Sequence, residues 1–139
     1  MVGGAGSGAP GLTMLGASGL LLLALGLVAD YERAQRVLTL LLLAPLLEEA
    51  IFRAGLQEAL LRRWQSHPRL ANVATAAAFG LAHVVIRADF AAFSVALPAL
   101  LIGEVYQRTG RLRLCVALHA AMNATWLAWN TAGPLLSSH

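Results

Sequence analysis

Five apolar runs, each close to the length of a membrane-spanning helix, divide the chain, and short segments that contain arginine connect them. The runs are Gly11–Ala29, Val37–Leu61, Leu70–Ile86, Phe90–Tyr106 and Leu114–Ala132. A helix that crosses the hydrocarbon core needs about 20 apolar residues, within a range of about 17 to 25. Because a backbone in lipid must satisfy its own hydrogen bonds, such runs fold as helices. The sequence therefore predicts an all-α integral membrane bundle of about five transmembrane helices.

The composition agrees with a membrane protein and argues against a nucleic-acid-binding surface. Of the 139 residues, 58% are hydrophobic and 12% are charged, whereas soluble domains carry about 25% charged residues. The net charge of +3 includes ten arginines and no lysine. These arginines cluster between the apolar runs, which is typical of a membrane boundary and not of one basic face. We expect no nucleic acid, and the lipid bilayer is the first expected partner.

The two ends of the chain lie outside the predicted helices. Residues 1–10, "MVGGAGSGAP", are predicted to be a disordered tail, and residues 133–139 a short C-terminal tail. No positive charge precedes the first run, so it is predicted to be a retained helix and not a secretory signal. The connections are too short for a second domain, so residues 11–132 are predicted to form a single transmembrane domain. The single cysteine, Cys115, excludes an intramolecular disulfide.

The arginines also predict an orientation in the membrane. The connections 62–69 and 107–113 hold six arginines, whereas the connection 30–36 and Arg87 together hold three. Cytoplasmic loops carry the excess of positive charge, so the N-terminus is predicted to be cytoplasmic. The bias toward alanine, leucine and arginine without lysine is typical of a GC-rich prokaryote, which predicts the inner membrane of such a cell.

The second apolar run contains "EEAIFR", in which two carboxylates and an arginine interrupt residues that suit lipid. A charged side chain in the bilayer costs roughly 3 kcal/mol on insertion scales. Glu49 and Arg53 are four residues apart, so they can pair along one helix face. Glu48 is rotated from Glu49 by about 100° and has no partner on its own helix. The alternative to a functional acid is a purely structural salt bridge.

Two further runs carry polar residues at a spacing of four, which places each pair on one helix face. His83 lies in "FGLAH", and His119 and Asn123 lie in "HAAMN". Each of these residues alone could be an interhelical hydrogen-bonding group. A free carboxylate, two imidazoles and an amide on three helices can together activate water and stabilise an oxyanion. Glu48, His83 and His119 would also suit zinc, although the H-E-x-x-H motif of soluble metalloproteases is absent.

The three stretches "EEAIFR", "FGLAH" and "HAAMN" resemble, in order, the EExxxR, FxxxH and HxxxN motifs of the CPBP family. This family comprises CAAX-type and bacteriocin-processing intramembrane endopeptidases, and the resemblance covers about residues 37–130. It implies hydrolysis of a peptide bond near the end of a membrane-associated protein or peptide, such as a CAAX-type tail, a sorting tail or a leader. The site residues that it implies are Glu48, Glu49, Arg53, His83, His119 and Asn123.

We expect Glu48 and His83 to activate the water, and His119 and Asn123 to stabilise the oxyanion, without a required cofactor. The family has been described both as metalloproteases and as glutamate-dependent proteases, so zinc held by Glu48, His83 and His119 stays open. Two non-enzymatic alternatives are a catalytically idle scaffold or immunity protein, and a small proton or ion carrier. The chain has fewer spans than familiar members often have, which leaves room for an oligomer or a helper subunit.

Depth along the helices is harder to reconcile with one site. At about 1.5 Å per residue from the nearest cytoplasmic arginines, Glu48 lies roughly 21 Å deep and His119 about 9 Å deep. Spacing places the members of each motif on a common face, but it does not place the three helices against one another.

Overall fold

The computed structural model describes the backbone of residues 10–136 and the side chains of residues 19, 21–23 and 25–130. All elements in this part of the chain are helices, as the apolar runs predict. The predicted tail 1–10 lies outside the described residues except for Pro10, and helix α6 continues to Leu136, past the predicted end at 132. The chain separates into two compact units, Met1–Val37 and Leu38–His139, and each is described by itself.

Helix α1 (Pro10–Leu38) accounts for the first unit and is longer than the run that predicts it. Residues 30–36 are predicted to be a loop between two apolar runs, and the loop is wrong, because the segment is helical. The segment contains no glycine or proline, and Asp30 pairs with Arg33 at 3.6 Å on an exposed surface. Residues that tolerate helix and pair along it continue the helix where charge alone suggests a loop.

The second unit begins with a continuous helical stretch whose hydrogen-bonding pattern changes along its length. It comprises η1 (Thr39–Leu43), α2 (Ala44–Glu49), η2 (Ala50–Gln57) and α3 (Glu58–Arg63), of which both η segments are π-helical. Pro45 lies near the start of α2 inside this continuous stretch and has no N–H to donate to the preceding turn, where the Leu40 carbonyl accepts from Asn123 Nδ2. π-helical turns are rare and are frequent at functional sites. The two acids of the first motif lie between these two segments.

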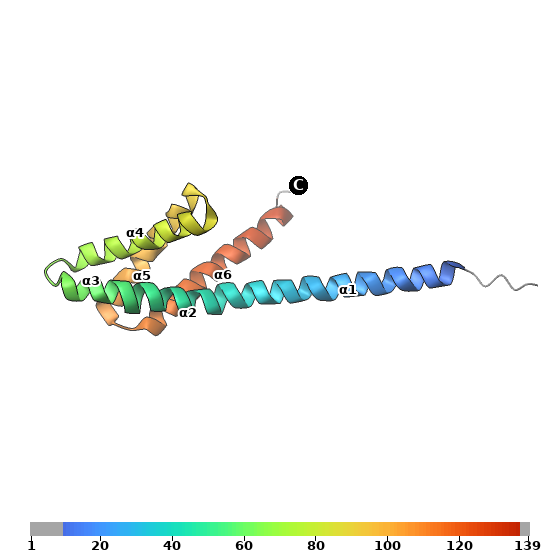
Figure 1. The fold of residues 1–139 in the computed structure, drawn as a ribbon, viewed down its shortest axis with the longest axis horizontal. Coiled ribbons are helices and arrows are strands. Elements are labelled where there is room, and N and C mark those ends of the chain that lie inside the picture. The colour runs from blue at the N-terminus through green and yellow to red at the C-terminus, as the bar shows by residue number, and fades with distance from the viewer. Residues whose placement is uncertain (1–9, 137–139) are drawn as a thin grey trace, which may run out of the picture. The chain divides into compact units, whose positions relative to one another are not determined.

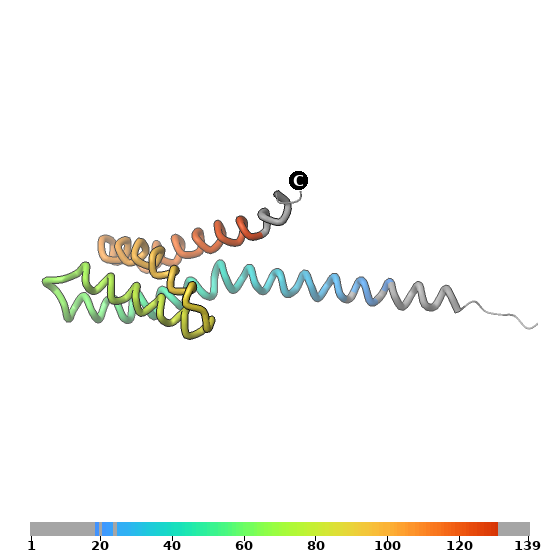
Figure 2. Tube along the Cα trace, turned by 90° about the horizontal axis from the view of Figure 1, so that it is seen from above, coloured from blue at the N-terminus to red at the C-terminus, as the bar shows by residue number. Residues whose placement is uncertain are grey.

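The remaining helices of the second unit fold back along this stretch (Figures 1 and 2). α4 (Pro68–Arg87) packs against α3 and η2, and the 3₁₀ segment η3 (Phe90–Val95) and α5 (Ala96–Thr109) pack against α4. α6 (Leu112–Leu136) packs against α5, α2 and η1. The η2 segment itself contacts α4, α5 and α6, so polar side chains on it can meet all three helices.

The inside of the second unit is lined mainly by small and polar residues, together with Phe79, Ile102 and Tyr106, and many large apolar residues face outward. On α4, η3 and α5 the buried apolar residues include Ala71, Ala76, Ala92, Ala96 and Ala99. By contrast, Val85 is 79% exposed and Leu97 is 68% exposed. A soluble domain buries such side chains, whereas small residues at helix contacts are typical of membrane bundles.

Two stretches are long and apolar enough to cross a membrane, among the residues that could be searched: Pro68–Arg87 and Phe90–Thr109. They coincide with the third and fourth predicted runs. The all-helical class and the membrane character are therefore supported, and the count of five spans stays a prediction.

Gly103 allows α4 to approach α5 closely, and we expect its replacement by alanine to be destabilising. An added methyl group would collide with the side-chain oxygen of Asn72 and lie 3.0 Å from Gln57 Oε1. Neither group is free to withdraw, because Asn72 Nδ2 donates to the Leu100 carbonyl at 3.1 Å and Gln57 Nε2 donates to the Gly103 carbonyl at 2.9 Å. The expected net loss is roughly 1–2 kcal/mol in the free energy of unfolding.

Gly55→Ala is the matched control for this prediction, because its added methyl group would meet only the Ala50 carbonyl oxygen at 3.6 Å. Alanine is favoured over glycine inside a helix by roughly 1 kcal/mol, so this variant should match or exceed the parent. Thermal unfolding of both variants in one detergent gives the comparison. Equal stability of Gly103→Ala and Gly55→Ala would contradict the close approach of α4 and α5.

Candidate active site

Glu49 lies at the centre of a buried polar network. Its side chain is fully buried, and each carboxylate oxygen has a partner. Oε2 accepts a hydrogen bond from Arg53 Nε at 2.7 Å, and Oε1 accepts from His119 Nδ1 at 2.8 Å. A buried carboxylate is tolerated when it is paired and hydrogen-bonded in this way. The ion pair predicted from the spacing of four is present, and the contact with His119 on α6 is one that spacing could not show.

Arg53 extends the network from Glu49 to α5. Its guanidinium is fully buried; Nη1 donates to Gln57 Oε1 at 3.2 Å, and Nη2 donates to the Ala99 carbonyl at 3.0 Å. Gln57 in turn donates to the Gly103 carbonyl. Gln57 was not predicted as part of the site, although the spacing 49–53–57 along one apolar run is a signal that could have found it.

Glu48 has a different environment from Glu49. Its side chain is 29% exposed, and its Oε2 lies 3.6 Å from His119 Nε2, which is longer than a hydrogen bond. His119 therefore lies between two carboxylates, with Nδ1 bound to Glu49 and Nε2 turned toward Glu48. A carboxylate that is accessible and not committed to an ion pair is suited to accept a proton.

His83 and Asn123 each use one polar group to contact the backbone. His83 Nδ1 lies 3.0 Å from the Phe79 carbonyl. Because a carbonyl only accepts, Nδ1 carries a proton in this contact, and Nε2 is left for another partner. Asn123 Nδ2 donates to the Leu40 carbonyl at 2.8 Å and so connects α6 to η1. The second amide hydrogen of Asn123 is not needed for that bond.

One cavity of about 120 Å³ brings the three motifs together. The four residues predicted to act on water and oxyanion all line it: Glu48, His83, His119 and Asn123. A water molecule occupies about 30 Å³ in the liquid, so the cavity is large enough for water beside a reacting group. Arg87, which the sequence suggests only as a boundary residue, also lines this cavity. Glu49 and Arg53 do not line the cavity; they belong to the buried network that binds His119.

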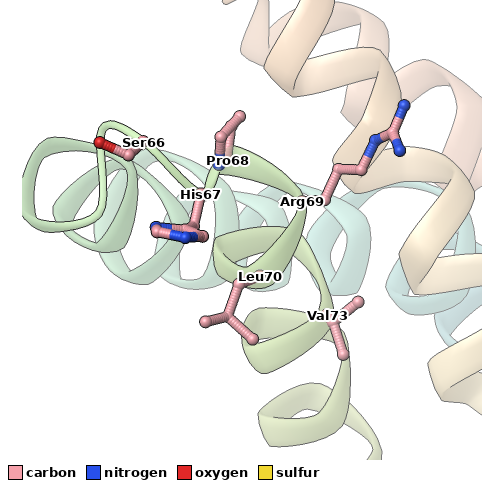
Figure 3. Close-up of a pocket in the computed structure, with 6 residues that line it drawn as sticks. All are labelled: Ser66, His67, Pro68, Arg69, Leu70 and Val73. Atoms are coloured by element: carbon pink, nitrogen blue, oxygen red, sulfur yellow. The ribbon is translucent and has the colours of Figure 1, made fainter.

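A second hollow, of about 640 Å³, lies at the turn between α3 and α4 (Figure 3). It is lined by Ser66, His67, Pro68, Arg69, Leu70 and Val73. None of these residues belongs to the three motifs. The larger hollow is therefore separate from the site that the motifs define.

The predicted zinc ligands do not form a ready metal site. Within the described residues, no three His, Cys, Asp or Glu side chains are arranged to hold a metal ion. A catalytic zinc takes three protein ligands, and only the Nε2 atoms of His83 and His119 are left for one, because their Nδ1 atoms contact the Phe79 carbonyl and Glu49. The geometry does not fit a preformed zinc centre, and whether the protein needs a metal stays a prediction to be tested.

A helical bundle that is apolar outside and holds an acid, two imidazoles and an amide around one inner cavity has the groups of a membrane hydrolase. Residues 30–125 of the 139 match the family model of type II CAAX prenyl endopeptidases, Rce1-like. The chain belongs to this family of membrane proteases, which confirms the predicted CPBP membership. No curated protein and no solved structure gives a significant match. Membership of a protease family does not favour the idle scaffold or the ion carrier.

Proposed function

We propose that the protein is an intramembrane endopeptidase that hydrolyses a peptide bond near the terminus of a membrane-associated protein or peptide. The observation that supports this most is the position of His119. It lies between Glu49, which is buried, and Glu48, which lines the cavity. A carboxylate and an imidazole beside one small cavity are the groups that general-base hydrolysis needs. The candidate substrates are CAAX-type tails, sorting tails and leader peptides.

In the proposed mechanism, Glu48 is the general base. It takes a proton from a water molecule while the water oxygen attacks the carbonyl carbon of the scissile bond. His83 is the second group that holds this water, because its Nε2 is free while Nδ1 binds the Phe79 carbonyl. Collapse of the tetrahedral intermediate breaks the C–N bond, and the proton held by Glu48 passes to the leaving amine.

The oxyanion of the intermediate is assigned to His119 and Asn123. Asn123 donates its second amide hydrogen, since the first binds the Leu40 carbonyl. His119 donates from Nε2 only when both ring nitrogens carry protons, because Nδ1–H is used by Glu49. Glu49 and Arg53 thus act through His119, by fixing the ring in place, and do not themselves touch the substrate.

We expect Asn123→Ala to lower kcat by roughly 10²–10³-fold, the loss that follows removal of one oxyanion donor. The substitution also removes the bond to the Leu40 carbonyl, which contributes about 0.5–1.5 kcal/mol to stability. The melting temperature is therefore measured with the rate. Asn130→Ala is the matched control, because Asn130 lies on the same helix, is exposed, and among the described residues donates to the Trp126 carbonyl at 2.7 Å. Similar kcat values for the two variants would exclude Asn123 from the site.

The cleavage test uses the purified full chain in lipid vesicles and two peptides of one sequence that ends in a CAAX tail. One peptide is prenylated on the tail cysteine and the other is not; a leader-type hydrophobic peptide is the third substrate. We expect cleavage near the terminus of at least one membrane-bound peptide, located by mass spectrometry. Absence of cleavage of all three would contradict the proposed function.

We also propose that no cofactor is required, so a strong chelator in the same assay should leave the rate unchanged. Activity that is lost in the chelator and restored by zinc would overturn this. The metal would then be held by Glu48 and by the Nε2 atoms of His83 and His119, whose Nδ1 atoms keep their present partners.

We also propose how the protein is arranged in the membrane. About five spans, a cytoplasmic N-terminus and a prokaryotic inner membrane agree with the two spanning stretches and with the arginine distribution. The charged helical segment 30–36 can lie at the membrane surface between two spans. An oligomer or a helper subunit is part of the same proposal.

A further inference from the structure

We propose that Arg87 binds the free α-carboxylate at the substrate's C-terminus and so selects peptides that are cleaved close to a free end. This inference rests on the proposed peptidase function. It adds the chemical group that the enzyme recognises and the residue that recognises it.

Arg87 is placed to do this by the end of α4. It is the last residue of the helix, its side chain is exposed, and the chain turns directly after it through Ala88, which has a φ of 50°. The Arg87 side chain lines the same cavity as Glu48. It therefore brings a cation to the wall of the cavity where the scissile bond would lie.

The guanidinium of Arg87 has no carboxylate partner within the described residues. Arg62 pairs with Glu58 at 3.0 Å and Arg108 with Glu104 at 2.7 Å, whereas Arg63, Arg69, Arg111 and Arg113 also have no such pair among the described residues, so it is the cavity that sets Arg87 apart. An unpaired guanidinium presents a planar set of N–H donors that matches a carboxylate in a two-pronged contact. The group that Arg87 could bind is therefore one that arrives with the ligand.

The charge of the cavity gives a reason for such a cation. A peptide cut near its end brings a negative carboxylate close to Glu48, and like charges repel strongly where little water screens them. Arg87 offsets this repulsion and holds the terminal carboxylate at a fixed place in the cavity. A peptide that ends in an amide carries no such charge and gains nothing from Arg87.

The alternative is an arginine that only marks the membrane boundary at the end of a helix. Arg69 on the first turn of the same helix is an arginine of that kind. It is exposed, and it lines the separate hollow of Figure 3 that contains no motif residue. Arg69 is thus a control that removes the same charge from the other end of α4.

The test uses two peptides that differ only at the C-terminus, one a free acid and the other an amide. Each is assayed with the wild type, Arg87→Gln, Arg87→Lys and Arg69→Gln in lipid vesicles. We expect the wild type to prefer the acid by about tenfold in kcat/KM, the scale of a hydrogen bond to a charged group. Arg87→Gln should bring the acid to the level of the amide and leave the amide within about twofold. Arg87→Lys should keep part of the preference, because an ammonium attracts a carboxylate without the two-pronged contact.

Arg69→Gln is expected to keep the full preference. Equal cleavage of the two peptides by the wild type, or an unchanged preference in Arg87→Gln, would overturn the role of Arg87 and leave the peptidase function standing. Cleavage of neither peptide would count against the function itself. Binding of both peptides to Glu48→Gln, with and without Arg87→Gln, then still tests Arg87: the acid should bind about tenfold more tightly than the amide only where Arg87 is present.

Discussion

Glu48→Gln is expected to abolish peptide cleavage while the protein stays folded in the membrane. Glutamine keeps the size of glutamate and most of its hydrogen bonding, but it cannot take a proton from water. General acid–base groups contribute about 10²–10⁴-fold to rates, so kcat should fall by about that factor. Stability should change little, because the Glu48 side chain is partly exposed and its closest charged neighbour, His119, is 3.6 Å away.

The measurement combines a cleavage assay with a melting curve on the same preparation. Glu104→Gln is the matched control, because Glu104 lies on α5, pairs with Arg108 on an exposed surface, and does not line the cavity. A rate for Glu48→Gln equal to that of Glu104→Gln would mean that Glu48 is not the base. A large drop in melting temperature with Glu48→Gln would favour the structural salt bridge as the reason for this acid.

The sequence was sufficient to predict which side chains share a helix face. Glu49 and Arg53 pair at a spacing of four, and His119 and Asn123 line one cavity from a single helix. Such relations depend only on the helical repeat. The apolar runs predicted helices for the same physical reason, since backbone groups in lipid bond within their own segment.

Contacts between helices could not be predicted in this way. Counting residues at about 1.5 Å each places Glu48 roughly 12 Å deeper than His119, whereas Glu48 Oε2 and His119 Nε2 are 3.6 Å apart. The count assumes straight, parallel α-helices. Two π-helical segments, Thr39–Leu43 and Ala50–Gln57, flank the acids and change the residues per turn, and helix crossing is not encoded in any spacing.

Two residues, Arg87 and Gln57, show that residue type alone does not identify every member of the site. Arg87 was interpreted from its position between apolar runs, and only the cavity wall shows that it shares a space with Glu48. Gln57 is a neutral residue in an apolar run, and its burial becomes meaningful only through its bonds to Arg53 and to the Gly103 carbonyl. The roles of both residues follow only from the structure, which packs α4 and α5 against the helical stretch that carries the first motif.

Glu49→Gln is expected to cost both stability and activity, in contrast to Glu48→Gln. The substitution leaves Arg53 buried beside neutral partners only, Gln57 Oε1 and the Ala99 carbonyl. Removal of one partner from a buried ion pair destabilises by about 3–5 kcal/mol. It also takes the charged acceptor away from His119 Nδ1, which lies 2.8 Å from Glu49 in the wild type.

A double variant separates these two effects. Glu49→Gln with Arg53→Met removes the uncompensated charge, and replacing a buried ion pair by neutral residues of similar volume is often close to neutral for stability. The melting temperature should therefore recover toward the wild-type value, while cleavage stays low because His119 still lacks its carboxylate. If cleavage recovered together with stability, Glu49 would serve only to hold the fold. If the single variant Glu49→Gln melted like the wild type, the Glu49–Arg53 pair would not be the buried, unscreened contact that its 2.7 Å distance and full burial indicate.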